Sequence, residues 1–579
     1  MGNDLALPDQ TPPPHRPLAT GRLIPQDKLD RQRYCPGDFW LGRTFSGKSF
    51  GWKDDVNLLT CAGPRAGKGV SVVVPNLLEF PGSAVVVDPK GELATLTARH
   101  RRHRLGQKVI VLDPARSADV PEELRGSYNP FDELYSHDPY VITAAQVIAS
   151  GIVTPNPKAR EPFWDDSAVD LIQSAILYLL KYYPNDCTLM KLRETVALGD
   201  REGYEDWVKG QRELDPKFET EASGPFHHMI DQMYDTPDFG GVVRETAAKI
   251  ARMGEQTRGS VLSTAATHLD FVKSPELWEV LKTSEDPGRT FQLKELRRQD
   301  RPLTVYLCLP VDMMHRQGRW FRMIIAQMIK FIERTSFDKA RDLPVLMMID
   351  EFFQLGPMPS IINTLTYSPG FGLRLWLVVQ DLNQLKANYP DTWETIIGAC
   401  GIKQFFGVND LTTAKYVSEL LGEQEIDLPS VTLGASRTVT ESENRSVTLG
   451  ESQSDTSGLT TTSGSGQNVG SSRKDYHLFG TASRSTSSSA SIAQSASRSI
   501  GTSQSETSGT GTSRSLAENR GYTITHQARK LFHPEEVTRA FTRDNLVQLL
   551  HLRDHGGCLL LRTPYYADPF FAPLLEDRA

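Results

Sequence analysis

Short apolar runs, each the length of a β-strand, recur in two parts of the chain. The runs in the first part are 57–62, 83–87 and 109–112, and those in the second are 303–309, 345–349, 373–379 and 404–408. Apolar runs of this length, separated by helical segments, are typical of parallel strands that are buried on both faces. The pattern therefore predicts an α/β domain built on a parallel sheet.

Residues 128–290 separate the two parts and have a different pattern. Their apolar positions recur at the spacing of amphipathic helices, most clearly in 167–182 and 247–272, and runs of strand character are missing. We therefore predict an inserted all-α domain at 128–290. The α/β domain would then comprise residues 51–127 and 291–429.

Residues 430–515 form an insertion of another kind. More than half of them are Ser, Thr or Gly, and large apolar residues are few. Such a segment cannot bury enough surface to offset its ordering entropy, so we predict a long disordered insertion. Alternation around Thr438 leaves weak strands as the alternative. Apolar content returns in 516–579, where 546–552 and 558–561 should pack against the sheet as the C-terminal part of the α/β domain.

Composition narrows the class of protein. The 64 basic and 71 acidic residues give a formal charge of −7, which argues against a protein coated in nucleic acid but allows a ring with a positive inner surface. The basic run at 99–104 is either a solvated helix face or a phosphate-contacting surface. The six scattered cysteines indicate free thiols in a reducing compartment. The pattern in residues 1–50 predicts a proline-rich N-terminal arm without a signal peptide. The sequence has no run of about eighteen apolar residues, so we predict no transmembrane helix.

The strongest chemical signal is a glycine-rich turn between a predicted strand and a predicted helix. In this context, backbone N–H groups converge on phosphate oxygens and Lys68 reaches the terminal phosphates. The predicted nucleotide-binding residues are Gly63, Pro64, Arg65, Ala66, Gly67, Lys68, Gly69 and Val70. Two positions depart from the usual phosphate loop: Ala62 stands for the first glycine, and Gly69 stands where a Ser or Thr hydroxyl would bind Mg²⁺.

A second signal lies at the end of the apolar run 345–349, which is followed by Asp350 and Glu351. A buried parallel strand would deliver both carboxylates to the sheet edge that carries the phosphate loop. Asp350 could hold Mg²⁺ through water, and Glu351 could act as the general base on the attacking water. Together the two motifs predict an ATPase with ATP and Mg²⁺ as its ligands.

The run 373–379 supplies two further candidates. Gln380 follows it, and a polar residue at the tip of the strand next to the carboxylate strand can sense the γ-phosphate. Arg374 lies at its beginning and is either an ordinary solvated arginine or an arginine finger for the site of a neighbouring subunit.

The succession of motifs resembles the TraG-type coupling proteins of bacterial conjugation and type IV secretion. The matching segments are GPRAGKGVSVVVPNLL, VVVDPKGEL, YNPFDEL, FWDDSAVDLI, RGSVLSTAATHLDF, VYLCLP, MMIDEFFQLG, FGLRLWLVVQDLNQL and NDLTTAKYVSELLG. They cover about residues 39 to 425, and HPEEV at 533–537 with YYADPFF at 565–571 extends the resemblance. The family also has the Gly-Lys-Gly ending of the loop, so Gly69 is compatible with it.

The resemblance implies a RecA-like P-loop NTPase motor domain with an inserted all-α domain, assembled as a homo-hexameric ring. Its members use ATP to bring relaxase-bound single-stranded DNA or effector proteins to a type IV secretion channel. The DxKGE stretch with Asp88, Lys90 and Glu92 would lie near the nucleotide or the ring interface. Family members usually begin with transmembrane helices. Their absence here predicts a cytoplasmic protein, peripheral at the inner face of the membrane, with a separate anchoring subunit or no anchor.

Two alternatives remain. A DNA-packaging or chromosome-segregating translocase would share the motor, although the helical insertion and the YYADPFF ending favour a coupling protein. A cargo-docking platform that binds nucleotide weakly is the other, and Gly69 is the residue that supports it.

Overall fold

The computed structural model describes residues 21–32, 34–53, 56–154, 163–215, 218, 224–441, 456–462, 493–499, 503–508 and 512–574, and it leaves the side chains of residues 427–526 and of 315 undescribed. Two units result. One comprises residues 23–417 and 534–579, and the other comprises residues 1–22 and 418–533. Among the helices of the described residues, none combines the length and apolar character that a membrane crossing requires.

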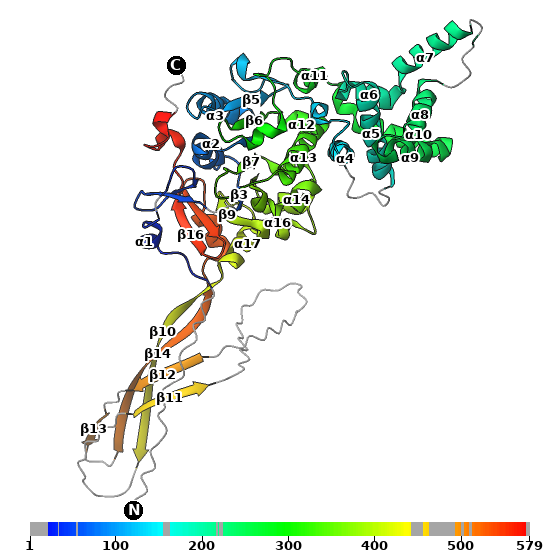
Figure 1. The fold of residues 1–579 in the computed structure, drawn as a ribbon. Helices are drawn as coiled ribbons and strands as arrows, with labels where there is room; N and C mark the ends of the chain where they lie inside the picture. The colour runs from blue at the N-terminus through cyan, green and yellow to red at the C-terminus, as the bar shows by residue number, and fades with distance from the viewer. Residues whose placement is uncertain are drawn as a thin grey trace, which may run out of the picture. The chain divides into compact units, whose positions relative to one another are not determined.

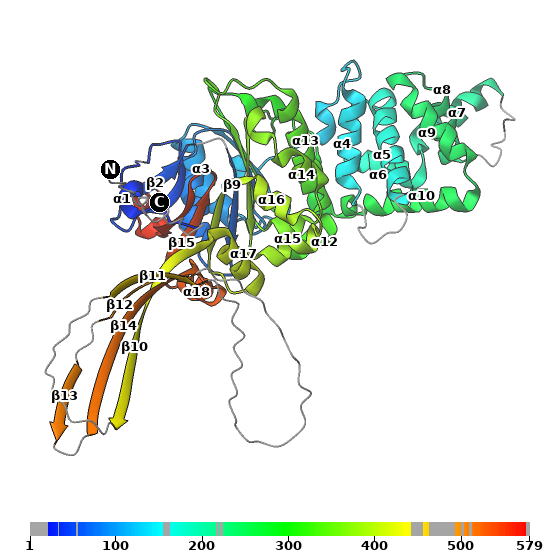
Figure 2. The ribbon, with the colours of Figure 1, turned by 90° about the horizontal axis from the view of Figure 1, so that it is seen from below.

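A single sheet organises the larger unit (Figures 1 and 2). Within the described residues it has eleven strands in the order β2-β1-β16-β15-β9-β3-β8-β7-β4-β6-β5. Seven neighbouring strands are parallel: β3 (Asn57–Ala62), β4 (Ala84–Val87), β5 (Lys108–Leu112), β6 (Leu303–Leu307), β7 (Val345–Ile349), β8 (Leu373–Val379) and β9 (Cys400–Phe406). They correspond to the seven apolar runs. Nearly every one of their residues is buried, as a sheet covered on both faces requires.

Four antiparallel strands extend the sheet beyond β9. They are β15 (Val547–Leu552), β16 (Gly556–Leu561), β1 (Phe39–Arg43) and β2 (Ser49–Trp52). The first two lie where the sequence predicts buried C-terminal elements. The other two lie largely within the segment 1–50, in which we expected only an arm. Their apolar runs are too short to show a periodic pattern, so the sequence did not predict them. Residues 1–20 of that segment lie outside the described residues.

Buried polar side chains join the C-terminal strands to the parallel core. Trp376 Nε1 donates to Thr60 Oγ1 at 2.9 Å, and Thr60 Oγ1 donates to Gln404 Oε1 at 2.9 Å. Gln404 Nε2 donates to Gln548 Oε1 at 2.5 Å, and Gln548 Nε2 donates to the carbonyl oxygen of Leu41, also at 2.5 Å. These hydrogen bonds link residues of β8, β3, β9, β15 and β1, and they pass over β16, which lies between β15 and β1. Each buried amide or hydroxyl that they satisfy would otherwise cost about 1–3 kcal/mol, so they help to hold these strands together.

An array of helices follows β5 in the chain. It contains α4 (Val141–Ile152), α5 (Phe163–Tyr182), α6 (Leu189–Leu198), α7 (Arg201–Leu214), α8 (Pro225–Asp235), α9 (Val242–Arg252), α10 (Glu255–His268) and α11 (Pro275–Leu281). The described residues between β5 and β6 contain no sheet strand, which agrees with the predicted helical insertion. In α5, every residue from 171 to 180 is buried, so this helix is covered on all sides and lies in the core of the array. The array meets the α/β part where α4 packs against α13 (Arg319–Arg334).

The smaller unit contains strands from the Ser/Thr-rich segment. Strand β10 (Glu423–Glu441) pairs antiparallel with β14 (Thr512–Lys530) over their whole lengths, and β13 (Ser503–Ser508) adds to β14. Strands β11 (Thr456–Thr462) and β12 (Ala493–Ser499) form a separate pair. In these ranges the structure has the strands that the sequence left as the alternative to disorder. The rest of the segment lies outside the described residues.

The basic run at 99–104 belongs to α3 (Glu92–His103) and is partly internal. Arg101 is fully buried, and its guanidinium donates to the carbonyl oxygens of Leu77 at 2.5 Å and Gly82 at 3.1 Å and to Thr304 Oγ1 at 2.9 Å. Arg101 therefore cannot belong to a phosphate-contacting surface, and such a role for the remaining residues of the run stays a prediction.

Candidate nucleotide site

The glycine-rich turn connects β3 to the helical segment Gly69–Val73, which continues as α2 (Val74–Glu79). Two of its glycines are required by the backbone. Gly67 has a φ of +86°, which L-residues rarely adopt. Gly63 passes so close to Gly407 that a Cβ atom would lie 2.3 Å from the Gly407 carbonyl oxygen. The turn therefore has the tight backbone path that a phosphate-binding loop needs.

Four residues that the sequence singled out meet at the carboxyl ends of neighbouring parallel strands. Strand β8 lies between β3 and β7, so Gln380 lies between the loop of Lys68 and the carboxylates of β7. Lys68 Nζ is 2.6 Å from Glu351 Oε1 and 3.2 Å from Asp350 Oδ1. Gln380 Nε2 donates to Glu351 Oε2 at 2.9 Å. The ammonium and the amide thus engage both oxygens of Glu351.

The environment of this cluster sets its charges. Burial alone would lower the pKa of Lys68, but Asp350 and Glu351 outweigh it and raise that pKa, so the ammonium stays protonated. Burial raises the pKa of Asp350, and the attraction of Lys68 opposes that rise. Glu351 has a φ of +52°, an unusual conformation for a non-glycine residue, which occurs where a strand ends abruptly at a functional turn.

The space around Gly69 bears on the fit of Mg²⁺. A Cβ atom at Gly69 would have no neighbour within 4 Å among the described residues, so its lack of a hydroxyl is not dictated by packing. The loop N–H groups, Lys68 and the carboxylates of Asp350 and Glu351 fit a nucleotide phosphate with its cation. The loop itself offers the cation no side-chain oxygen at Gly69.

Asp88 lies at the carboxyl end of β4, the strand next to β7, and is buried. Its Oδ2 accepts the N–H of Ala94 at 2.8 Å, so it caps the first turn of α3. Burial raises the pKa of Asp88 to about 7, with Asp350 contributing to the rise. Lys90 and Glu92 are exposed. The structure places the DxKGE stretch beside the site, as the resemblance implies, but only Asp88 is directed into the interior.

Arg374 does not join the site of its own chain. It lies near the amino end of β8, at the opposite edge of the sheet from Gln380. The residue is 5% exposed, its guanidinium lies 5.2 Å from the ring centroid of Phe39, and Nη2 donates to the carbonyl of Lys53 at 3.3 Å. An arginine finger must project from the surface of its subunit. The predicted finger role therefore stays a prediction, and the burial of Arg374 in its own chain argues against it.

Sequence reasoning missed one residue at the loop. Arg562 follows β16 and is 2% exposed, and its Nη1 donates to the carbonyl of Ala66 within the phosphate loop. These two residues are 496 positions apart, and no motif joins them. The only available signal was a single arginine directly after the buried run 558–561.

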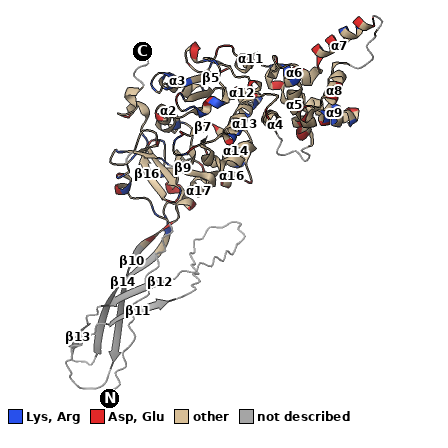
Figure 3. Cartoon of the chain, viewed as in Figure 1, with Lys and Arg blue, Asp and Glu red and all other residues tan. Residues whose placement is uncertain are grey.

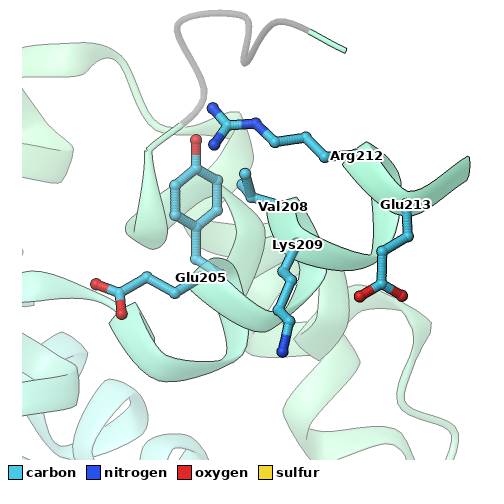
Figure 4. A pocket seen from close by; sticks show the side chains of 6 residues that line it. Glu205, Val208, Lys209, Arg212 and Glu213 are labelled. Carbon is cyan, nitrogen blue, oxygen red and sulfur yellow. The ribbon is translucent and has the colours of Figure 1, made fainter. Parts of the chain in front are cut away.

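Two cavities lie away from this site. One, of about 510 Å³, lies between α4, α5, α13 and α14 (Pro359–Leu365). The other, also about 510 Å³, lies on α7, where acidic and basic side chains occur side by side (Figures 3 and 4). Its lining residues are Tyr204, Glu205, Val208, Lys209, Arg212 and Glu213. Neither cavity includes Lys68 or the carboxylates.

The fold and the cluster define a P-loop NTPase with an inserted helical array. A family model described as "Type IV secretory system Conjugative DNA transfer" matches residues 22–454, so the chain belongs to this family. The resemblance seen in the motifs is confirmed.

Curated relatives agree with this family. A conjugal transfer protein TraG of Escherichia coli is 28% identical over 395 residues, which are 66% of this chain and 57% of the relative. A VirD4 protein of Agrobacterium fabrum is 26% identical over 382 residues, 66% of this chain and 51% of the relative. The chain thus spans little more than half the length of the curated relatives it matches.

Solved structures agree on the fold. The bacterial conjugative coupling protein TrwBΔN70 in complex with sulphate has a TM-score of 0.57 at 14% identity, covering 96% of each chain. TrwB in complex with ADP and Mg²⁺ has a TM-score of 0.54 at 14% identity, again covering 96% of each. The predicted RecA-like P-loop fold with its helical domain and its insertion is confirmed.

Proposed function

We propose that this protein is an ATP-driven coupling protein. It would recruit single-stranded DNA carried by a relaxase, or effector proteins, and move them into a type IV secretion channel. The observation that carries the proposal is the convergence of Lys68, Asp350, Glu351 and Gln380 at one sheet edge. Membership of the conjugative DNA transfer family and the TrwB complex with ADP and Mg²⁺ support it.

The residues divide the work of hydrolysis. The loop N–H groups and the Lys68 ammonium bind the phosphate oxygens, and Lys68 neutralises charge that develops as the γ-phosphate leaves. Mg²⁺, held through water by Asp350, would supply further charge neutralisation. Glu351 accepts a proton from the attacking water as its oxygen bonds to phosphorus and the bond to the leaving ADP breaks. Gln380, hydrogen-bonded to Glu351, would report the presence of the γ-phosphate to β8.

The proposal includes the assembly in which the motor acts. A homo-hexameric ring, peripheral at the inner face of the cytoplasmic membrane and held by a separate subunit, would draw substrate through its centre. Membrane fractionation and co-purification with channel components test this arrangement. Recovery only in the soluble fraction, with no channel component attached, would contradict it.

Steady-state ATP hydrolysis with and without single-stranded DNA tests the motor itself. We expect stimulation by DNA, and loss of turnover in Lys68→Ala without loss of fold, because Lys68 neutralises phosphate charge and belongs to no apolar cluster. Loss of its ion pairs with Asp350 and Glu351 should lower the melting temperature. A wild-type chain that binds nucleotide but hydrolyses none, with DNA or a protein substrate present, would instead be a docking platform.

A mixing experiment tests the role of Arg374. Arg374→Ala subunits combined with Lys68→Ala subunits would create some sites that have both an intact loop and an intact finger. Recovery of activity in such mixed rings supports the finger role. If mixed rings form but show no recovery, the finger role is wrong, and Arg374 acts only within its own chain, where its guanidinium packs on Phe39.

A further inference from the structure

The buried side chain of Arg562 contacts the phosphate loop. Its guanidinium lies 4.3 Å from the ring centroid of Phe406 and donates through Nη1 to the carbonyl of Ala66. Nη2 reaches the carbonyls of Thr542 at 3.4 Å and Arg543 at 3.3 Å. One planar group therefore ties the loop to the segment that follows α18 (Pro534–Ala540).

The contact with Ala66 determines the direction of a neighbouring donor. In a trans peptide unit, the C=O and the following N–H point in opposite directions because the unit is planar. When Arg562 holds the Ala66 carbonyl, the N–H of Gly67 must point the other way, away from Arg562. Phosphate loops bind anions through backbone N–H groups that converge in this manner. Rotation of that one peptide would turn the N–H away and present a carbonyl oxygen to the phosphate.

The hydrogen-bond pattern of Arg562 differs from that of the buried Arg101 and is shared by Arg322, which donates to the carbonyl oxygens of Leu355 and Pro357 away from the loop. Arg101, equally buried in the same domain, has hydrogen-bond partners for all three of its guanidinium nitrogens. Arg562 leaves its buried Nε without a partner among the described residues. Burial lowers the pKa of Arg562 to about 10, so it stays charged at neutral pH, and its hydrogen-bond acceptors are carbonyl oxygens. A buried charge without a carboxylate partner is costly to maintain.

We propose that Arg562 is the positioning residue of the phosphate loop, holding the Ala66–Gly67 peptide so that its N–H faces the nucleotide phosphates. This inference rests on the proposed nucleotide-binding function. Because the same guanidinium holds Thr542 and Arg543, the geometry of the loop depends on the segment that re-enters the domain after the Ser/Thr-rich insertion.

The test measures the binding of a fluorescent ADP analogue with Mg²⁺, and the KM and kcat for ATP, in the full-length chain. Arg562→Met should weaken binding and raise KM about tenfold or more, the effect of one lost charge-assisted hydrogen bond. The kcat at saturating ATP should change less than about threefold, because Lys68 and Glu351 are untouched. Arg562→Lys, which keeps a charge and one donor to the loop, should recover part of the affinity.

Arg297→Met is the matched control. Arg297 also donates to backbone carbonyls, those of Ile332, Phe371 and Gly372, but at the amino edge of β8. Its loss should lower the melting temperature and leave KM unchanged. If Arg562→Met lowers only the melting temperature or the fraction of active protein, with KM as in wild type, Arg562 is structural and the inference is wrong.

Two further outcomes distinguish failure of the Arg562 proposal from failure of the proposed nucleotide-binding function. If wild-type protein binds no nucleotide, or Lys68→Ala binds as tightly as wild type, the proposed function fails first. If both Arg562 variants fail to fold, experimental structures of the wild-type chain with and without ADP decide. A Gly67 N–H that faces the phosphate site in both states supports a loop held in place by Arg562, and a peptide that turns to face the site only when ADP is bound overturns it.

Discussion

Replacing Glu351 by glutamine separates nucleotide binding from hydrolysis. Glu351 accepts hydrogen bonds from the Lys68 ammonium at 2.6 Å and from the Gln380 amide at 2.9 Å, and it is 6% exposed. The substitution removes one ion pair but also removes the repulsion between Glu351 and Asp350, which raises the pKa of Asp350. These effects offset each other, so we expect stability to change by no more than about 1 kcal/mol. Loss of a general base, by contrast, costs about a hundredfold to ten-thousandfold in rate, or about 3 to 5 kcal/mol in the barrier.

The assay is phosphate release at saturating Mg-ATP with single-stranded DNA, together with equilibrium binding of ATP. Glu351→Gln should bind ATP within about threefold of wild type, because Lys68 is released from one competitor, and should turn over at least about a hundredfold more slowly. Glu333→Gln is the control. Glu333 accepts Lys330 at 3.1 Å and Thr364 at 2.7 Å, away from the loop, and its loss should leave turnover unchanged. Turnover of Glu351→Gln within about tenfold of wild type would refute its role as the base.

Three other changes probe the site and the fold. Gly69→Ser should not lower the melting temperature, because the added Cβ meets open space, and a fall in melting temperature would contradict this. The same variant should need a lower Mg²⁺ concentration for half-maximal ATPase activity. Replacing residues 442–511 by a short glycine-rich turn, which closes β10 and β14 at the Glu441–Thr512 pair, should leave ATPase activity near wild type, and a sharp loss would make the segment structural. Burial, aided by Lys403, lowers the pKa of His551 below its usual 6.5, so the unfolded chain binds that proton more tightly and stability should fall as the pH drops below about 6.5. The His551→Gln variant should lose less melting temperature than wild type between about pH 7.5 and 5.5, and an equal loss would exclude His551 as a cause.

Much of the fold could be predicted because parallel strands buried on both faces leave continuous apolar runs. The same runs locate the site, since Asp350 and Gln380 follow directly after two of them. The position of Arg374 could also have been predicted. A residue that begins a parallel strand lies at the far edge from one that ends it, so Arg374 and Gln380 could not meet within one chain.

Other features could not be predicted because their causes are not local in the sequence. The strands β1 and β2 are stabilised by C-terminal strands, and their aromatic residues become a pattern only once β16 lies beside them. Arg562 has meaning only through a contact with Ala66, which topology creates. For residues 430–441, low apolar content favoured disorder. The full-length pairing of β10 with β14 supplies backbone hydrogen bonds that composition does not record.

The strand order has a consequence for biosynthesis. Strands β1 and β2 are made before the other described strands of the sheet, but they join it through β16, which is made after all of those strands. Translation at about 5–20 residues per second leaves those two strands without their neighbour while most of the chain is synthesised. Arg562 follows β16 in the chain and is made after it. A nascent or truncated chain that stops before Arg562 would therefore have its parallel strands and the glycine-rich turn but lack the group that positions the turn, and we expect it to bind ATP more weakly than a chain that includes Arg562.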